Sequence, residues 1–328
     1  MTTDERMRKW YGEGMNIFWV NTELGMLTNE VKRVKSIIDA HAHIYEILKG
    51  YGAKGEFRPL GGGKGIWATG KVEQFFPAEY GDTGFYAETL IKLMDEAGVD
   101  RAVLLQGGNY GFHNDYMAEA AAKYPDRLTA VGAIDPYALY AEDIFDNLVS
   151  RYNFTALKFE ISSEWGLSGF HRELKLTDEA FSRLFEKANV LGMTVAIDMG
   201  TMAMKSFDFE GFKSVTEKYR NILFVMTHCF FPNNDGKNEM RLDFARSLTG
   251  DNFVMDIASL DVIAQAEYLK ELKNIIGAER MLWGSDLPGV LCRRSYKELV
   301  ARVGESGIFT ASELPLVMGE NAKRVYLK

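Results

Sequence analysis

Eight short apolar runs of strand length recur between residue 36 and residue 286. Several are almost continuously hydrophobic, which is typical of parallel strands buried on both faces. The runs cover residues 36–44, 101–108, 128–135, 155–161, 193–199, 222–228, 252–259 and 280–286. The intervals between them carry apolar residues at three- and four-residue steps. This spacing predicts amphipathic helices over 86–98, 176–192, 209–219 and 260–276.

The alternation of strand and helix predicts an α/β fold, specifically a (β/α)8 TIM barrel. Thr177 is the expected N-cap of the helix over 176–192, and Gly98 is expected to end the helix over 86–98. An open, doubly wound sheet is the alternative architecture. No GxGxxG pattern follows the first run, so that alternative lacks the dinucleotide-binding fingerprint.

Two segments fall outside the strand–helix rhythm. Residues 1–35 mix charges with several aromatic residues, which predicts an N-terminal helical extension, with a loosely ordered extension as the alternative. Residues 36–328 would then be a single catalytic domain. Residues 45–85 form a long loop after the first strand, and its aromatic residues favour a lid or a pocket wall. The GGGKG stretch at 61–65 is not a phosphate loop, since no Ser or Thr follows its lysine.

The composition narrows the kinds of partner. The 328 residues are 47% hydrophobic, with a formal charge of −8 and a pI of about 5.3, which argues against nucleic acid or an anionic membrane. Two cysteines in so long a chain do not make a disulfide framework, and the first residues lack the apolar core of a signal peptide. We therefore expect a cytoplasmic protein with a small-molecule substrate. The aromatic residues near the N-terminus suggest a homodimer contact.

Ionisable residues gather where the predicted strands end. Active sites of such barrels lie at the carboxyl ends of the strands, and a charge after an apolar run is costly without a partner. His41 and His43 lie two apart on one strand, so their side chains leave the same face. We expect a shared cavity formed by the residues at the strand ends: His41, His43, Lys158, Glu160, Asp198, His228, Asp256, Ser259 and Asp286.

Simpler interpretations exist for several of these residues. His43 alone could be a core histidine, Lys158 and Glu160 could pair with each other, and Asp198 could cap the following loop. Two further histidines, at 113 and 171, are expected at the surface, and Cys229 is expected to pack in the core.

The combination of residue types indicates a metal-assisted reaction. Neutral imidazoles and carboxylates bind borderline divalent metals such as zinc or manganese. Such a metal lowers the pKa of bound water and polarises a carbonyl. A free carboxylate can take the proton of that water, and a histidine can stabilise the developing oxyanion.

Three motifs in chain order resemble the amidohydrolase-related family, in the branch of the aminocarboxymuconate-semialdehyde decarboxylase-like enzymes. They are the HxH of the first strand, the histidine in VMTHCFF and the aspartate in LWGSDLP. The stretches GVDRAVLLQG and AAAKYPDRLTAVGAIDP resemble that branch as well. The resemblance covers about residues 36–328. It implies a TIM barrel but no single reaction, because the family includes hydrolases, lactonases and non-oxidative decarboxylases.

The resemblance also implies roles for individual residues. His41 and His43 would be metal ligands, Asp286 a ligand or general base, and His228 a polarising or proton-transfer group. Asp198 stands where many relatives place a further ligand histidine, so we expect it to ligate the metal. Some members of the branch work without metal, so this departure leaves a metal-free site open. Lys158 is expected to contact substrate or Glu160 rather than to be carboxylated.

Three functions follow from the resemblance. The first is a metal-dependent hydrolase of a small cyclic or aromatic carboxylic acid, cleaving a lactone, ester or amide-type bond. The second is a non-oxidative decarboxylase of a hydroxylated aromatic or muconate-like acid, and the third is a non-catalytic binding barrel. The residues expected to contact the substrate are Lys158, Glu160, Trp67, Arg58 and Arg293, with Lys64 and Arg294 as further candidates for its carboxylate.

Overall fold

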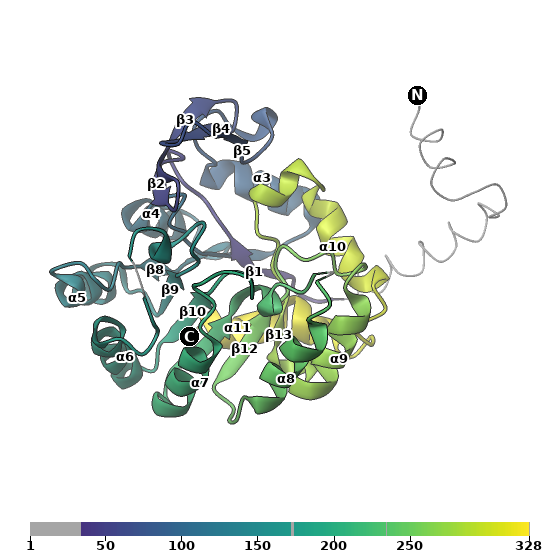
Figure 1. Cartoon of the computed structure of the whole chain (residues 1–328). Helices are drawn as coiled ribbons and strands as arrows, with labels where there is room; N and C mark the ends of the chain where they lie inside the picture. Colours follow the sequence, from purple (N-terminus) through teal and green to yellow (C-terminus); the bar gives the residue numbers. More distant parts are fainter. Residues whose placement is uncertain (1–33, 172–173, 234, 328) are drawn as a thin grey trace.

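Parallel strands lie at the centre of the molecule and helices surround them (Figure 1). The computed structural model describes residues 34–171, 174–233 and 235–327, so the predicted extension over 1–35 lies almost wholly outside the described residues. Each of the eight predicted runs contains a parallel strand, and the third run contains two. These strands are β1 (Ile38–Ala42), β6 (Arg101–Leu104), β7 (Leu128–Ala130), β8 (Gly132–Ala133), β9 (Ala156–Glu160), β10 (Thr194–Asp198), β11 (Leu223–Met226), β12 (Phe253–Asp256) and β13 (Met281–Leu282).

Helices follow the strands, as the spacing of apolar residues predicts. The α-helices are α3 (Ala87–Ala97), α4 (Asn114–Lys123), α5 (Ala141–Tyr152), α6 (Glu179–Leu191), α7 (Phe209–Lys218), α8 (Asn238–Ser247), α9 (Ala266–Ile276), α10 (Tyr296–Glu305) and α11 (Asn321–Tyr326). Short 3-10 helices are η1 (Ala78–Tyr80), η2 (Leu167–Gly169), η3 (Thr227–Phe230), η4 (Ala278–Arg280) and η5 (Gly289–Cys292), and η6 (Leu316–Glu320) is a π-helix. None of the helices in the described part of the chain has the length and apolar character needed to cross a bilayer.

Two helix boundaries differ from the prediction. Asp178, not Thr177, is the N-cap of α6, and its carboxylate accepts a hydrogen bond from the backbone N–H of Lys175 (2.8 Å). Helix α9 begins only at Ala266, because residues 260–261 are irregular and residues 262–265 form turns. Gly98 ends α3 as predicted, in the left-handed conformation with φ 73°.

The parallel strands form two sheets whose ends are linked by hydrogen bonds. One has the order β1-β6-β7 and the other the order β13-β12-β11-β10-β9-β8. Strands β7 and β8 are separated only by Val131, whose N–H donates to the carbonyl of Leu104 (3.1 Å). At the other ends, the N–H of Ala40 donates to the carbonyl of Trp283 (3.0 Å). The carboxyl ends of all these strands therefore lie on one side of the molecule.

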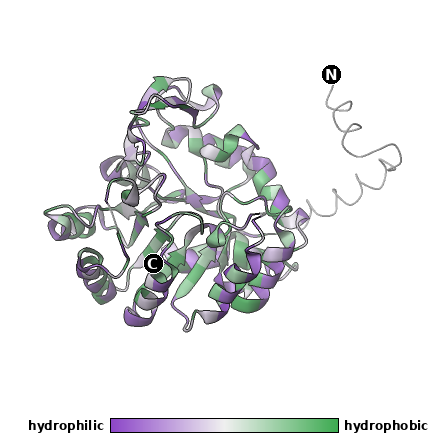
Figure 2. Ribbon diagram, in the orientation of Figure 1, coloured by the Kyte–Doolittle hydropathy of each residue, from purple (hydrophilic) through white to green (hydrophobic). Residues whose placement is uncertain are grey.

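Two hydrophobic layers position the strand ends. Small and β-branched side chains fill the space between the parallel strands, and α11 covers one end of it with Val325, whose carbonyl accepts a hydrogen bond from Thr194 Oγ1 (2.7 Å). A larger layer fills the space between strands and helices, and the helices alternate hydrophobic and hydrophilic residues (Figure 2). Ala156 and Ala196 belong to the inner layer. The strand period of two therefore directs the polar residues at the ends of β9 and β10 toward the same interior.

Residues 45–85 are not a structureless loop, contrary to the sequence-based interpretation. They form an antiparallel sheet of β2 (Gly50–Gly52), β3 (Gly55–Gly61), β4 (Lys64–Trp67) and β5 (Val72–Gln74), seen beside the parallel strands in Figure 1. The glycine-rich stretch is the turn between β3 and β4. Gly63 has φ 70° there, and a Cβ at this position would lie 2.1 Å from the carbonyl oxygen of Phe76.

Candidate active site

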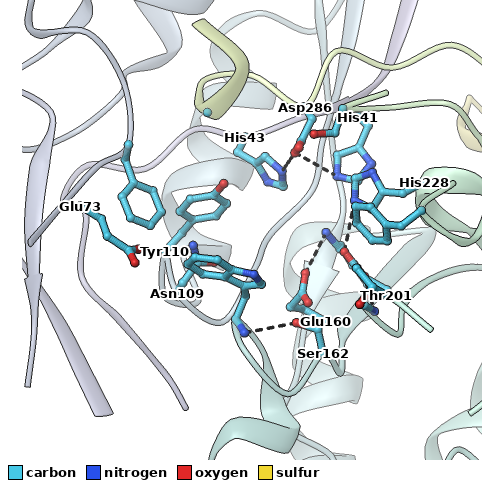
Figure 3. Close-up of a pocket in the computed structure, with 18 of the residues that line it drawn as sticks. His41, His43, Glu73, Asn109, Tyr110, Glu160, Ser162, Thr201, His228 and Asp286 are labelled. Carbon is cyan, nitrogen blue, oxygen red and sulfur yellow. Dashed lines mark hydrogen bonds and ion pairs between the residues drawn. The ribbon is translucent and has the colours of Figure 1, made fainter. Parts of the chain in front are cut away.

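A cavity of about 540 Å³ opens at the carboxyl ends of the parallel strands (Figure 3). Of the residues predicted to form a site, those that line it are His41, His43, Lys158, Glu160, Asp198, His228, Ser259, Asp286 and Arg293. They come from six of the eight predicted runs and from the segment after the last one. The structure therefore brings together side chains that lie as much as 250 residues apart in the sequence.

A local irregularity in β1 turns both histidines toward the cavity. The pairing of β1 with β6 shifts register between Asp39 and Ala42. Ala40 packs in the inner hydrophobic layer, whereas Ala42 packs in the outer one. His41 and His43 consequently share the inward direction beyond the shift, and their ring centroids lie 5.1 Å apart.

In each of these histidines, one ring nitrogen is hydrogen-bonded to a protein acceptor and the other faces the cavity. His41 Nδ1–H donates to Asp256 Oδ2 (2.9 Å), and His43 Nδ1–H donates to the carbonyl of Leu105 (2.9 Å). Because both acceptors require a proton on Nδ1, the neutral form of each ring has its free lone pair on Nε2. Burial lowers the pKa of His41 to about 4 and also lowers the pKa of His43, so both rings are neutral at physiological pH.

Asp286 completes a group of three potential metal ligands. Its Oδ1 lies 3.0 Å from His43 Nε2 and 3.8 Å from His41 Nε2, and the three ligand atoms lie within 4.8 Å of one another. Burial favours the neutral form of Asp286, but the hydrogen bond with His43 and the charge of His228 hold the pKa of Asp286 well below its usual range.

The geometry of this trio fits a divalent cation. His41 Nε2 is fully buried and has no hydrogen-bond partner. His43 Nε2 and Asp286 Oδ1, 3.0 Å apart, lie close enough to this nitrogen for all three atoms to bind one ion. Two imidazoles and one carboxylate are a donor set that suits zinc or manganese.

Asp39 binds the backbone at His41 and next to Asp286 through hydrogen bonds. Its Oδ1 accepts hydrogen bonds from the backbone N–H of His41 (3.0 Å) and of Ser285 (2.8 Å), and its Oδ2 accepts one from Tyr296 (2.6 Å). Burial raises the pKa of Asp39 to about 6. This single carboxyl group joins the first strand to the segment that carries Asp286.

His228 and Asp198 form an ion pair on the neighbouring wall. His228 Nδ1–H donates to the carbonyl of Ala258 (3.0 Å), and its Nε2 lies 3.2 Å from Asp198 Oδ2. Burial opposes the charge on His228, but Asp198 outweighs it and raises the pKa of His228 to about 10, so the ring is an imidazolium. The positive charge of His228 in turn overcomes burial and lowers the pKa of Asp198.

The expectation that Asp198 ligates a metal stays a prediction, and the structure gives its carboxylate two other partners. Its Oδ2 is engaged by His228, and its Oδ1 accepts from the backbone N–H of Gly200 (2.8 Å), so it also caps the following loop. The groups of potential metal ligands found among the described residues are His41 with His43 and Asp286, and His41 with His228 and Asp256, and neither includes Asp198. Asp198 is therefore placed as the counter-ion of His228.

A strained turn after β11 places His228. Four consecutive residues have positive φ: His228 (59°), Cys229 (45°), Phe230 (64°) and Phe231 (48°). Each such residue costs about 1–2 kcal/mol relative to an ordinary conformation. Asp256 offsets part of this cost, because its Oδ1 accepts the backbone N–H of His228 (2.8 Å). Cys229 is buried in the outer layer, where packing was predicted.

Arg241 on α8 holds the far side of this turn. Its fully buried guanidinium donates to the carbonyl of Phe230 (3.1 Å) and to both carboxylate oxygens of Asp235 (2.8 Å each). We expect Arg241→Met to lower the unfolding midpoint by about 5 °C or more, because a strained turn loses its support. Differential scanning calorimetry measures this. Arg246→Met on the same helix removes only surface ion pairs, and an equal loss there would contradict the argument.

Lys158 and Glu160 pair with each other, which was one of the predicted interpretations. Lys158 Nζ lies 3.6 Å from Glu160 Oε2, and the lysine side chain is almost fully buried. Burial and the neighbouring charge of Asp198 raise the pKa of Glu160 to about 8. This shift favours the protonated form of Glu160 near neutral pH, even with Lys158 beside it.

The wall beside His43 was not foreseen from the sequence. It is formed by Glu73 of β5, Phe75, Tyr110 and Trp165. Figure 3 shows Tyr110 next to His43, and the centroids of the two rings lie 4.7 Å apart. Phe75 meets the rings of Tyr110 and Trp165 edge-on, with centroids 6.0 and 6.4 Å apart. The aromatic residues of 45–85 indicated a pocket wall, but nothing in the sequence singled out these four side chains.

Two predicted substrate contacts do not line the cavity. Arg58 is exposed on β3, an inner strand of the antiparallel sheet, and it is not among the lining residues. Trp67 is almost fully buried behind the wall, where its Nε1–H donates to Glu73 Oε2 (2.9 Å). Trp67 therefore supports a lining residue from behind, and its contact with a substrate stays a prediction. His113 and His171 lie outside the cavity lining but are half-buried, not fully at the surface as expected.

Comparison with protein families gives a match over almost the whole described chain. Residues 38–328 match the family model described as Amidohydrolase. A search of curated proteins gave no match.

Solved structures share the fold at low sequence identity. A probable 2-pyrone-4,6-dicarboxylic acid hydrolase from Acinetobacter baumannii superposes with a TM-score of 0.63 and 15% identity, covering 89% of this chain and 100% of that one. A zinc-bound amidohydrolase from Burkholderia multivorans gives 0.63 and 16%, covering 89% and 99%. The manganese-bound 5-carboxyvanillate decarboxylase from Novosphingobium aromaticivorans gives 0.56 and 15%, covering 73% and 79%.

Proposed function

The chain belongs to the amidohydrolase family, and from that premise we propose that it hydrolyses a lactone, ester or amide-type bond of a small cyclic or aromatic carboxylic acid. As a member it is an enzyme, either a hydrolase or a carboxy-lyase. The observation that carries the proposal is the convergence of His41 Nε2, His43 Nε2 and Asp286 in one cavity. His41 Nε2 is buried without a hydrogen-bond partner and lies next to His43 Nε2 and the Asp286 carboxylate, so the three can bind a cation. The Asp286 carboxylate can also act as the base.

The fold proposed for this enzyme is one (β/α)8 barrel. The hydrogen bond between Ala40 and Trp283 and the near-continuity of β7 and β8 support the view that the two parallel sheets are parts of one ring. Two of the similar solved structures each cover 89% of this chain. The cavity lies at the carboxyl ends of the strands, where the active sites of (β/α)8 barrels are found.

We propose that His41, His43 and Asp286 hold one divalent ion, with zinc as the first candidate and manganese as the second. Zinc is bound in the Burkholderia relative and manganese in the decarboxylase. Such an ion supplies a Lewis acid that polarises the scissile carbonyl and makes water more acidic.

The chain's own residues supply the remaining chemistry. Asp286 is ionised and faces the cavity, so it can accept the proton of the attacking water. His228, as an imidazolium on the adjacent wall, offers positive charge to the oxyanion that develops on the substrate. Arg293 at the rim is the candidate for the substrate's carboxylate, since a guanidinium matches that group's geometry.

Decarboxylation is the second candidate, and one observation favours it. Glu160, whose pKa is raised to about 8, lines the cavity, and a decarboxylase needs an acid to protonate the carbon that loses carbon dioxide. Hydrolysis needs both this acid and a base that activates water. The ionised Asp286 beside the proposed cation provides that base, so we place hydrolysis first.

The two functions differ in the fate of water. A panel of pyrone and other lactone carboxylates, esters of aromatic acids and hydroxylated benzoic acids should be incubated with the purified enzyme in ¹⁸O-labelled water. We expect mass spectrometry to show one labelled oxygen in the carboxylate product of a lactone or ester. Carbon dioxide release from the hydroxybenzoic acids, without any labelled hydrolysis product, would reject hydrolysis in favour of the lyase.

A further inference from the structure

A row of ionisable side chains crosses one wall of the cavity. Lys158 and Glu160 come from β9, Asp198 ends β10, and His228 follows β11. Glu160 and Asp198 are direct partners in the β9–β10 register, so their side chains leave the same face of the sheet side by side. His228 Nε2 lies 3.2 Å from Asp198 Oδ2. The four groups therefore form a row of neighbouring charged side chains across three neighbouring strands.

The hydrogen-bond partners show where the protons lie. Asp198 accepts from the backbone N–H of Gly200 and from His228, which are both donors, so Asp198 is the carboxylate. Glu160 lies beside this carboxylate, and burial together with the charge of Asp198 raises the pKa of Glu160 to about 8 even though Lys158 Nζ is 3.6 Å away. Glu160 is therefore the group of this row that can carry a proton. Its position, with a side-chain exposure of 11% in the cavity lining, leaves it accessible to a bound substrate.

We propose that Glu160 is the catalytic acid of the hydrolysis, donating its proton to the oxygen of the leaving alcohol or enol. The inference rests on the proposed function. Water adds its oxygen to the acyl carbon while Asp286 takes its proton. The bond from the acyl carbon to the leaving oxygen then breaks, and that oxygen takes the proton of Glu160. Proton return from Asp286 to Glu160 through cavity water resets both groups.

The other donors on this wall are less suited to the leaving group. Both ring N–H groups of His228 are already engaged, by Ala258 and by Asp198. Lys158 is almost fully buried beneath Glu160 and pairs with it. Glu160 also lies across the cavity from Asp286, as Figure 3 shows, so base and acid approach the substrate from different walls. This separation lets one group accept a proton while the other donates one.

The test uses esters of one acid with leaving groups that range from an activated nitrophenol to an unactivated methanol. Glu160→Gln keeps the size of the side chain and removes the acidic proton. We expect kcat/KM for the methyl ester to fall by about 10²–10⁴-fold, while the nitrophenyl ester, whose leaving group needs no proton, falls by less than about 10-fold. The slope of log kcat/KM against the leaving-group pKa should therefore become steeper. Glu160→Asp, which retains an acid, should restore part of the lost slope.

The outcomes separate this inference from the proposed function. An equal fractional loss for all esters in Glu160→Gln, or no loss for any, would overturn the role of Glu160 while leaving hydrolysis intact. Failure of the wild-type enzyme to hydrolyse any ester would instead reject the proposed function. Glu186→Gln, on the exposed face of α6, serves as the matched control and should leave the slope unchanged. Circular dichroism of each variant verifies the fold. If Glu160→Gln does not fold, the dependence of kcat/KM on the leaving-group pKa is measured with Glu160→Asp instead.

Discussion

Replacement of Asp286 by asparagine is expected to lower kcat by about 10³-fold or more while the protein stays folded. The amide is nearly isosteric with the carboxylate, but it cannot accept the proton of the attacking water. Asparagine is also the appropriate substitute for the backbone, because Asp286 has φ 64° and asparagine tolerates that conformation better than alanine does. Steady-state kinetics with the best substrate of the panel measure the loss, and circular dichroism verifies the fold.

An exposed aspartate, Asp251, provides the matched control for Asp286→Asn. Asp251→Asn removes an exposed carboxylate that pairs only with Arg220 at the surface, so its kcat should equal that of the wild type. Because a base removed from the chemical step acts on turnover, KM should change far less than kcat in Asp286→Asn. A wild-type kcat in this variant would exclude Asp286 as the base.

The predictable part of this site follows from the geometry of parallel strands. The carboxyl ends of such strands share one edge, so His41, Asp198, His228 and Asp286 could be placed together from their positions after apolar runs alone. The inward direction of Lys158 follows from the strand period of two, counted from Ala156. These inferences need only local periodicity and one topological rule, and both are present in the sequence.

The remaining features depend on contacts that local sequence does not encode. The turn that places His228 has positive φ at four residues, yet VMTHCFF has no glycine to indicate it, since Asp256 and Arg241 from other elements stabilise it. The partner of Asp198 was missed for the same reason, because a counter-ion and a metal ligand look alike in sequence. The sheet over 50–74 did have a local signal in the glycines that separate its short runs, but the segment was interpreted as a long loop because it falls outside the strand–helix rhythm.

Removal of the imidazole at position 41 is expected to abolish metal binding and, with it, catalysis. His41→Ala deletes the one buried ligand nitrogen that has no other partner, leaving only His43 and Asp286. Inductively coupled plasma mass spectrometry of protein purified without added metal should give about one ion per chain for the wild type. The same measurement should give only background for the variant. Chelation of the wild type should remove activity, and added zinc or manganese should restore it.

Asp256→Asn provides a graded version of the same experiment. Asp256 accepts the Nδ1–H of His41 and so orients the ring, but it contributes nothing to the proposed ligand set itself. Loss of such a supporting carboxylate typically costs about 10–100-fold in metal affinity. The expected order of metal retention is therefore wild type, then Asp256→Asn, then His41→Ala, with His171→Ala as a surface control equal to the wild type. Full activity in metal-free wild-type protein would contradict the cation and leave Asp286 and the imidazoles to act directly on water and substrate.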